Sequence, residues 1–493
     1  MLFHSYIFVL LFLPLVWLGY FCLIKKGNSC SVSIWLIAAS LTFYGYLNPY
    51  YVILILISVA GNYSIGRHLA LRCGDKTVIY RKWLLGGGIA MNILILVYFK
   101  YAMMLADLWN VVTEIHISIG DIIVPAALSF YTFQQIAFLV DSYKNKITRE
   151  EYNLLDYCLF VTFFPQLIAG PIVKHSEMAA QLKKPDAKDW GMKWAVALSL
   201  FTIGLFKKVV IADYLAGQSV PFFDGVMQGQ IVSAVAMWYH SACYFFYYYF
   251  DFSAYCDMAI AIAWLFGVRL PVNFASPLKA SSLIVAWQRW HITVCRFFRE
   301  YFYRYLSFRK SGSVGFIAAV LLTMALAGLW HGKSLTLLVW GVLQGVLLLL
   351  NYQLRKYSFV YIPKAVGRLL ILLNAIWMLP FFVSDSFANL PSIYAALSGE
   401  GGIGSVQSLS PEQWGIFCII SFIIYFLPNA YQWLGRYNPA LPVRGYPATY
   451  ITGQDTVWIK WKPTWVWAII IGVMFSLCLF AMTNPQAFLY FRF

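Results

Sequence analysis

Two histidines that lie forty positions apart, His291 and His331, have the side chains best suited to chemistry in this 493-residue chain. His331 stands in a run from Phe316 to Leu350 whose only ionisable members are His331 and Lys333, so we expect the bilayer to surround it. An ionisable group at that depth is costly and by default indicates a functional site. A neutral imidazole there can accept the proton of an attacking hydroxyl. The alternative is a histidine that only hydrogen-bonds between helices. The glycines near His331 favour the catalytic interpretation, because small residues let backbones and ligands approach closely.

The second histidine opens a segment that is too basic to cross lipid. This segment contains Arg289, Arg296, Arg299, Arg304, Arg309 and Lys310. We expect an amphipathic or re-entrant piece at the cytoplasmic interface. Its basic residues are typical of an ordinary cytoplasmic cluster. The alternative is a binding site for an anionic donor such as the phosphates of coenzyme A. For His291 itself, a structural role at the interface is the stronger interpretation from spacing alone.

The composition indicates a membrane protein. Hydrophobic residues make up 61% of the chain and charged residues 11%, whereas soluble domains carry roughly 25% charged residues. At about 20 apolar residues per crossing, the apolar runs predict about ten or more spans in one all-α polytopic unit. The net charge of +16 comes from short basic clusters between these runs, which is typical of cytoplasmic loops and argues against nucleic-acid binding. The nine cysteines show no metal-ligand spacing, so no metal site is predicted.

The basic loops also predict the topology. Lysines follow the first apolar run, Phe3 to Ile24, which places the N-terminus outside. This run lacks a basic leader and an Ala-x-Ala cleavage site, so we expect a retained helix. Further helices are expected near residues 31–47, 50–66, 83–99, 122–140, 194–211, 231–249, 369–383, 413–430 and 464–483. This alternation places both termini on the extracytoplasmic side.

One apolar segment is interrupted by proline. Leu154 to Val173 contains Pro165 and Pro171, and proline breaks the helical hydrogen-bond ladder. Irregular backbone at membrane depth is tolerated only where protein or a water-filled cavity surrounds it. The segment is therefore predicted to be broken or re-entrant.

Two carboxylates, Asp251 and Asp257, follow a dense aromatic stretch. They would be costly against lipid, so we expect them to face the bundle interior or an aqueous cavity. The favoured interpretation is structural pairing with Arg269 or with arginines between residues 289 and 304. A proton relay is the alternative.

Several uncommon strings occur in order between residues 40 and 350. They are Phe130-Tyr131-Thr132-Phe133-Gln134, Asp141-Ser142-Tyr143, Phe164-Pro165-Gln166-Leu167-Ile168-Ala169-Gly170-Pro171-Ile172, Tyr249-Phe250-Asp251-Phe252-Ser253, Trp290-His291-Ile292-Thr293, Phe298-Arg299-Glu300-Tyr301 and Gly328-Leu329-Trp330-His331-Gly332. Together they resemble the signature of the membrane-bound O-acyltransferases. Within that family the resemblance is closest to the membrane component of alginate O-acetyltransferase. That component is also similar to the protein that exports D-alanyl groups to teichoic acid.

The resemblance implies a fold and a donor. It implies a ring of roughly 10–12 transmembrane helices, with re-entrant segments, around a thin central tunnel. His331 would be the catalytic histidine in the tunnel, and His291 would line its cytoplasmic side. The donor would be acetyl-CoA, used as a substrate, with no bound cofactor. Arg289, Arg296 and Arg299 would then contact coenzyme A.

The C-terminal tail carries a second resemblance. Phe488-x-Tyr490-x-x-Phe493 is similar to a motif of this branch and of a small partner in D-alanylation, where the tyrosine hydroxyl is proposed to carry the acyl group. A phenol with a pKa of ~10 needs a base to become a useful nucleophile, and His331 could supply it. An aromatic anchor at the membrane interface is the alternative for Tyr490.

The resemblance implies O-acetylation of an extracytoplasmic polysaccharide, such as alginate, cellulose or a similar exopolysaccharide. The acetyl group would come from cytoplasmic acetyl-CoA and would pass directly or through a periplasmic acetyltransferase partner. One departure, Tyr305 to Gly312 in place of the family's Gly-Gly-Asn-Arg-like turn, suggests a sub-branch with a different acceptor. The alternatives are D-alanyl or other acyl transfer to teichoic acid or peptidoglycan and, in another class, a polysaccharide or small-molecule transporter.

We expect one integral unit over residues 1–493 in the bacterial cytoplasmic (inner) membrane, in contact with its lipids. It would comprise a family-like core (40–350), C-terminal helices (351–483) and an extracytoplasmic tail (484–493).

Overall fold

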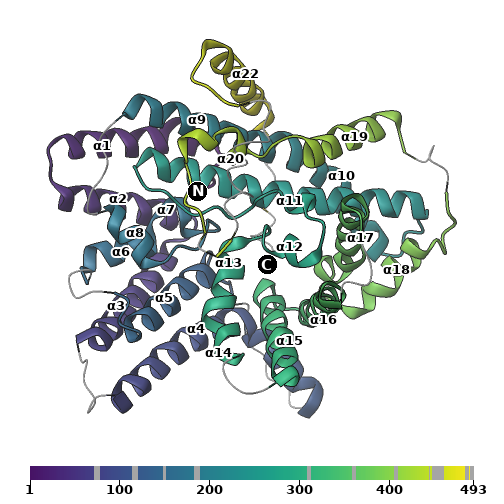
Figure 1. Ribbon diagram of the computed structural model, residues 1–493, viewed down its shortest axis with the longest axis horizontal. Helices are drawn as coiled ribbons and strands as arrows, with labels where there is room; N and C mark the ends of the chain where they lie inside the picture. Colours follow the sequence, from purple (N-terminus) through teal and green to yellow (C-terminus); the bar gives the residue numbers. More distant parts are fainter. Residues whose placement is uncertain are drawn as a thin grey trace. The chain divides into compact units, whose positions relative to one another are not determined.

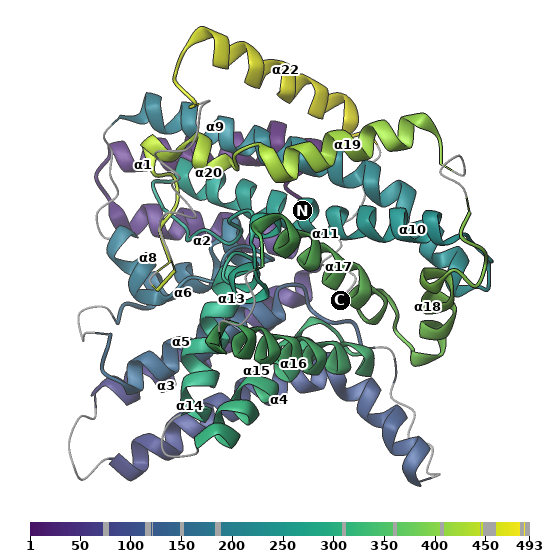
Figure 2. The ribbon, with the colours of Figure 1, turned by 45° about the vertical axis from the view of Figure 1, so that its right-hand side comes forward.

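The part of the chain that the structure describes is mostly helical. The computed structural model describes residues 1–71, 78–113, 120, 122–147, 152–182, 189–307, 312–357, 362–404, 409–443, 445–446, 460–483 and 488 (Figures 1 and 2). Within these ranges the extended pairing consists of an isolated bridge between Pro271 and Leu441. Seven helical stretches in the same ranges are long and apolar enough to cross a membrane, and three shorter apolar helices accompany them. The predicted all-α polytopic membrane fold is confirmed, whereas the ring around a tunnel stays a prediction.

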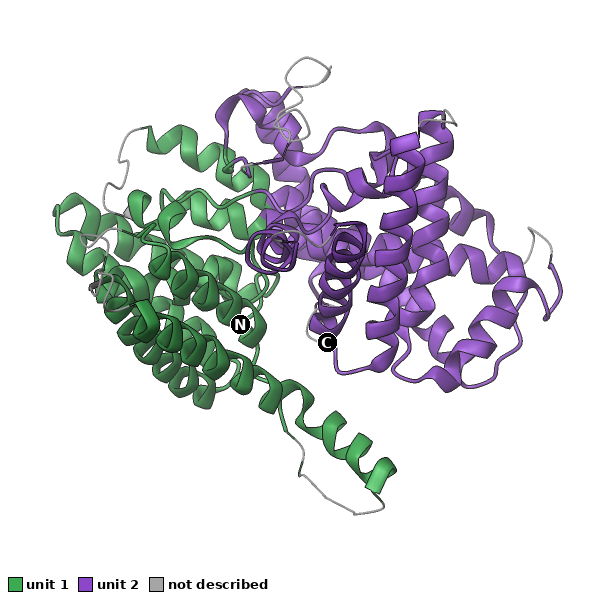
Figure 3. Ribbon diagram, turned by 60° about the horizontal axis from the view of Figure 1, so that its bottom comes forward, with its two compact units in different colours: residues 1–201, 258–271, 439–441 green, residues 202–257, 272–438, 442–493 purple. Residues whose placement is uncertain are grey.

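The described residues form two compact units, shown in different colours in Figure 3. Unit 1 comprises Met1–Phe201, Met258–Pro271 and Pro439–Leu441, and unit 2 comprises Thr202–Asp257, Val272–Asn438 and Pro442–Phe493. The expectation of one integral unit, with its core, C-terminal helices and tail, stays a prediction.

Unit 1 is built from the N-terminal helices. They are η1 (Ile7–Phe12), α1 (Leu13–Lys25), α2 (Ser29–Gly45), α3 (Pro49–Leu71), α4 (Val78–Thr113), α5 (Leu128–Tyr143), α6 (Leu154–Thr162), α7 (Phe164–Leu167) and α8 (His175–Leu182). Most of α9 (Trp190–Phe206) and the end of α11 (Ala234–Leu265) also belong to it.

Buried amides join three helices of unit 1. The Asn62 amide donates to Gln135 Oε1 at 2.7 Å, and the Asn92 amide donates to Asn62 Oδ1 at 2.6 Å. These contacts join α3, α5 and α4. Hydrogen bonds between polar side chains stabilise helix association where lipid supplies no hydrophobic driving force.

The predicted break between residues 154 and 173 is present. Helix α6 ends at Thr162, and Phe163 leaves helical geometry with φ −50° and ψ 107°. The chain resumes as the four-residue α7, whose first turn contains Pro165. The Phe164 N–H donates to Ser40 Oγ at 3.1 Å, so a side chain of α2 replaces a lost helical acceptor.

Unit 2 holds the remaining helices. They are η4 (Lys207–Ala212), α10 (Asp213–Met227), most of α11, η5 (Pro277–Lys279), α12 (Leu283–Trp287), α13 (Ile292–Phe297), η6 (Phe298–Tyr303), α14 (Arg304–Leu306), α15 (Gly312–His331), α16 (Leu335–Tyr357), α17 (Lys364–Val383), η7 (Phe387–Asn389), α18 (Leu390–Ser398), α19 (Pro411–Phe426), α20 (Ala430–Trp433), η9 (Gly435–Tyr437) and α22 (Trp465–Ala481). Helix α15 packs against α16, and α16 packs against α17.

Asp251 and Asp257 are paired, but with lysines that the sequence analysis did not name. Asp251 Oδ1 lies 2.7 Å from Lys208 Nζ, and Asp257 Oδ2 lies 2.8 Å from Lys207 Nζ. Both lysines stand in the π-helical turn η4, and a π-turn changes the phase of the helix. The guanidinium of Arg269, a predicted partner, instead lies over the Trp264 ring at 4.6 Å.

Candidate active site

Close packing of two helices positions His331. A Cβ atom on Gly328 would overlap a carbonyl oxygen of α16, and one on Gly341 would overlap a carbonyl oxygen of α15. Glycine at both positions lets the two backbones touch. His331 is the last residue of α15, three positions after Gly328, and its ring lies 5.6 Å from the Trp340 ring of α16.

The turn after His331 is fixed to the end of α17. Ser334 Oγ donates to the Asp385 carbonyl at 2.9 Å, and Thr336 Oγ1 donates to the Ser384 carbonyl at 2.7 Å. These bonds join the α15–α16 turn to the residues that follow Phe382. The Phe382 ring lies 5.0 Å from the His331 ring, so α17 supplies a second wall beside the imidazole.

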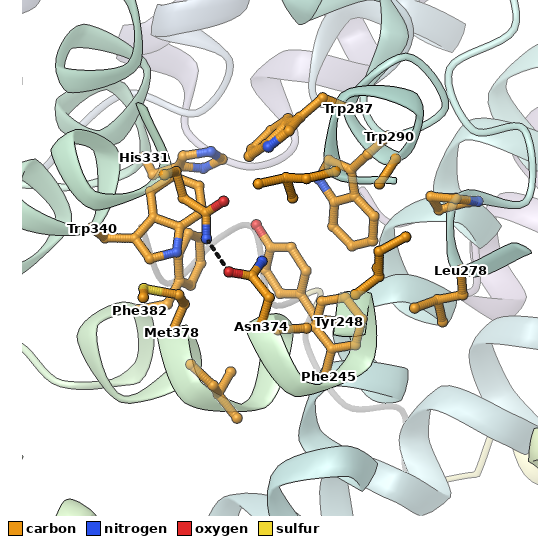
Figure 4. A pocket seen from close by; sticks show the side chains of 17 residues that line it. Phe245, Tyr248, Leu278, Trp287, Trp290, His331, Trp340, Asn374, Met378 and Phe382 are labelled. Atoms are coloured by element: carbon orange, nitrogen blue, oxygen red, sulfur yellow. Dashed lines mark hydrogen bonds between the residues drawn. The ribbon is translucent and has the colours of Figure 1, made fainter. Parts of the chain in front are cut away.

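His331 lines an aromatic cavity of about 110 Å³ within unit 2 (Figure 4). Its walls come from α11, η5, α12, α15, α16, α17 and the residue Trp290. They are formed by Phe245, Tyr248, Pro277, Leu278, Leu283, Ala286, Trp287, Trp290, Trp340, Gln344, Ile371, Asn374, Ala375, Met378, Leu379 and Phe382. The His331 side chain is itself buried. A cavity with mostly apolar walls and a few convergent polar groups is the usual form of a small-molecule site.

Three uncharged polar side chains share the cavity with His331. The Tyr248 ring stacks on Trp290 at 5.8 Å, and its hydroxyl points into the cavity (Figure 4). That hydroxyl is buried and has no hydrogen-bond partner among the described residues. The Gln344 amide donates to Asn374 Oδ1 at 3.5 Å. The cavity therefore offers a hydroxyl and an amide pair to a ligand beside the imidazole.

His291 is held in one tautomer. It caps the N-terminus of α13 in the left-handed region, at φ 42°. Its Nδ1 lies 3.1 Å from Asn273 Oδ1, which also accepts the Thr293 backbone N–H at 3.1 Å. Because a backbone N–H can only donate, the Asn273 atom that faces it is the acceptor oxygen Oδ1. Nδ1 of a neutral His291 must therefore carry the proton, and Nε2 carries the lone pair.

Burial favours the neutral form of His291. The side chain is 2% exposed. Burial, followed by repulsion from His331, holds the pKa of His291 well below its usual range. A neutral imidazole with its lone pair on Nε2 can accept a hydrogen bond or a proton.

Trp330 connects the two predicted histidines. Its ring lies 4.7 Å from the His331 ring and 5.5 Å from the His291 ring. The structure therefore brings His291 and His331 around one indole, although they come from different helices. Neither His291 nor Trp330 is among the residues that line the cavity.

The three predicted arginines lie outside the walls of the cavity. Arg296 is 2% exposed. The Arg299 guanidinium lies 4.6 Å from the Tyr446 ring. Arg289 is half-buried. Among the described residues that line the cavity, none is one of these arginines.

Arg289 instead belongs with two cations that the sequence analysis did not select. Burial, followed by the charges of Arg368 and Arg289, lowers the pKa of Lys279 to about 8. The Lys279 ammonium donates to the Leu427 carbonyl at 2.5 Å. Lys279 directly follows the cavity residue Leu278. Arg368 stands on α17 three positions before the cavity residue Ile371. A cluster of positive charge therefore lies beside the cavity.

Several site residues were missed because they carry no charge or no motif. Gln344 and Asn374 are polar residues inside apolar runs, so a search for ionisable groups does not find them. Asn273 orients His291 from 18 positions away in sequence, and no spacing rule connects the two. Tyr490 and the tail around it, except Phe488, lie outside the described residues.

Comparison with known proteins gives the family. The model of MBOAT, the membrane-bound O-acyltransferase family, matches residues 143–393. A peptidoglycan O-acetyltransferase of Helicobacter pylori is 37% identical over 83% of this chain and 81% of its own length. The chain belongs to the membrane-bound O-acyltransferase family. It is therefore a membrane-bound O-acyltransferase, and the match contains both histidines.

Other relatives point to the same chemistry. The probable alginate O-acetylase AlgI of Pseudomonas putida is 28% identical over the full length of both chains. A teichoic acid D-alanyltransferase of Bacillus subtilis is 24% identical over 48% of this chain and 60% of its own length. The O-acetyltransferases in this set are thus more similar to the chain than the D-alanyltransferase is.

Proposed function

We propose that this protein transfers an acetyl group from cytoplasmic acetyl-CoA to a hydroxyl of an extracytoplasmic glycan. The observation that carries the proposal is the cavity in which His331 lies beside a free tyrosine hydroxyl and an amide pair. The family membership and the O-acetyltransferase relatives support acetyl as the group transferred. The basic loops support a location in the cytoplasmic membrane with both termini outside.

In the proposed reaction His331 is the general base. Its imidazole takes the proton of the attacking hydroxyl as the oxygen bonds to the thioester carbonyl carbon. The carbon–sulfur bond then breaks, and the imidazolium returns the proton to the coenzyme A sulfur. The Tyr248 hydroxyl is available to donate to the carbonyl oxygen, where negative charge develops. His291 packs against Trp330 and would act as a positioning residue.

The donor's phosphates would bind outside the aromatic cavity. Lys279, Arg289 and Arg368 are three cations beside one wall of the cavity. Charge-assisted bonds from Lys and Arg are the usual means of binding phosphate. This assignment keeps Arg289 as a donor contact and gives Arg296 and Arg299 no direct part.

Delivery across the membrane would use the tail. The donor and the acceptor are on opposite sides, and an acyl group bound to a protein residue can cross without opening an aqueous path. Tyr490 is the proposed carrier, activated by His331 as base. The acetyl group would then pass to the glycan directly or through a periplasmic acetyltransferase partner.

Two acceptors follow from the relatives. The relative with the higher identity is named for peptidoglycan, and the full-length relative is named for alginate. Peptidoglycan and an alginate-like exopolysaccharide are therefore the two acceptors to supply first.

The test is vectorial transfer in proteoliposomes. Acetyl-CoA labelled in the acetyl group is enclosed, and each glycan is supplied outside with or without a periplasmic extract. We expect label in one glycan from the parent and none from His331→Ala. Label that survives Tyr490→Phe would retain the acetyltransferase and refute the carrier. If a folded parent neither releases coenzyme A nor transfers label, the proposal is refuted and a transporter is favoured.

A further inference from the structure

A buried ammonium group lies between two carboxylates in unit 2. The side chain of Lys208 is 0% exposed, and its Nζ lies 2.7 Å from Asp251 Oδ1 and 2.8 Å from Asp213 Oδ1. An isolated charge at such a site would be very costly, and the two carboxylates offset that cost. The neighbouring Lys207 forms a separate pair with Asp257, which also accepts the Tyr431 hydroxyl at 2.6 Å.

Phe488, a residue of the C-terminal tail, lies against this ammonium. The Phe488 ring centroid is 4.5 Å from Lys208 Nζ, and the ring meets Tyr255 edge-on at 4.9 Å. Phe488 is 2% exposed. A cation over an aromatic face is attracted by the ring quadrupole, most strongly where both groups are desolvated. Helix α22, which precedes the tail, packs against the η4 turn that carries Lys208.

One face of α11 connects this contact to the active site. Tyr248, Phe252 and Tyr255 are spaced i, i+4 and i+7, which places them on one side of a helix. Tyr248 lines the His331 cavity, Phe252 meets the His291 ring at 4.6 Å, and Tyr255 contacts Phe488. Seven residues advance a helix by about 10.5 Å. Phe488 thus contacts α11 two turns along from a residue of the cavity wall.

We propose that Lys208, held by Asp213 and Asp251, is a positioning residue that binds the C-terminal tail through Phe488. The contact fixes the chain two positions before Tyr490. The function of the Lys208–Phe488 contact rests on the proposal that Tyr490 carries the acyl group, because a carrier must return to the same place in every turnover. Binding of the tail is itself measurable without any acyl transfer.

The experiment measures how readily carboxypeptidase removes the last residues of the full-length protein in detergent. Phe488→Leu removes the aromatic face and leaves the ion pairs intact. Lys208→Met removes the cation, and Lys208→Arg restores it. Lys207→Met is the control, because it deprives the buried Asp257 of its lysine, as Lys208→Met deprives Asp213 and Asp251, but the Phe488 ring lies at Lys208. Thermal unfolding of each variant verifies that it is folded.

We expect the initial rate of removal to rise by roughly tenfold or more in Phe488→Leu and Lys208→Met, the effect of losing a desolvated cation–π contact. Lys208→Arg and Lys207→Met should match the parent. Equal protection in the parent and in folded Phe488→Leu would overturn the proposal, as would release in Lys207→Met equal to that in Lys208→Met. Release of the tail with unchanged acetyl transfer would support the binding of the tail and refute only the carrier.

Discussion

Replacing Gly328 with alanine should separate α15 from α16 and displace His331. The new Cβ atom would lie 3.0 Å from the Gly341 Cα atom and would overlap the Leu337 carbonyl oxygen. Non-bonded carbon atoms prefer a separation of about 3.5–4.0 Å. The helices must therefore move apart by roughly 0.5–1 Å at this point.

The displacement should affect catalysis more than folding. Overpacking of this kind costs about 1–3 kcal/mol, which a chain of this size can sustain. A misplacement of about 1 Å in a catalytic group can reduce the rate roughly 100-fold. We therefore expect acetyl transfer by Gly328→Ala to fall by roughly one to two orders of magnitude, with a modest loss of thermal stability.

The assay is coenzyme A release from acetyl-CoA by purified protein, with unfolding followed on the same samples. Gly415→Ala is the control, because a Cβ atom at this exposed position in α19 meets nothing within 4 Å. It should retain parental activity. A Gly328→Ala enzyme with parental activity would refute the argument that the glycine contact positions His331.

Three further results are expected. Tyr248→Phe should lower kcat roughly tenfold or more without unfolding the protein, because it removes a hydroxyl that points into the cavity. Asn273→Ala should lower activity, because it removes the oxygen that accepts hydrogen bonds from His291 Nδ1 and from the Thr293 hydroxyl. The measurement is kcat, with the unfolding temperature of the same variant. The KM for acetyl-CoA should rise several-fold as the pH increases from about 7 to about 9, because Lys279 is charged below a pKa of about 8 and loses its charge above it.

Each of these results has a clear opposite. Parental kcat in Tyr248→Phe would remove the hydroxyl from the mechanism. Full activity in Asn273→Ala would show that the tautomer of His291 is unimportant. Lys279→Arg, which stays charged, should give a KM that does not change over this pH range, and a KM that still rises would place the titrating group elsewhere.

Hydropathy predicted the long helices and missed their ends. The last helix was expected near 464–483 and runs over Trp465–Ala481, whereas the one expected near 83–99 runs over Val78–Thr113. Apolar composition identifies the stretch of about 20 residues that a crossing needs, and α4 is longer, at 36 residues. The break at Phe163 was predictable because proline acts locally on the backbone.

The site was only partly predictable. His331 stood out because an ionisable residue in an apolar run is rare. The lysine partners of Asp251 and Asp257 were not predictable in this way. They depend on the π-helical turn η4, which directs the consecutive side chains of Lys207 and Lys208 toward α11. The shape of the cavity depends on how α11, α16 and α17 pack, and no local pattern encodes that packing.

The measurement that tests the central claim most directly is acetyl-CoA turnover by His331→Ala compared with His240→Ala. Both histidines are buried in unit 2, but His240 stacks on Phe222 at 3.9 Å and does not line the cavity. Loss of a general base should reduce turnover by about 10²–10⁴-fold in His331→Ala, and His240→Ala should keep turnover close to the parent's. A folded His331→Ala enzyme that releases coenzyme A at the parental rate would contradict the account.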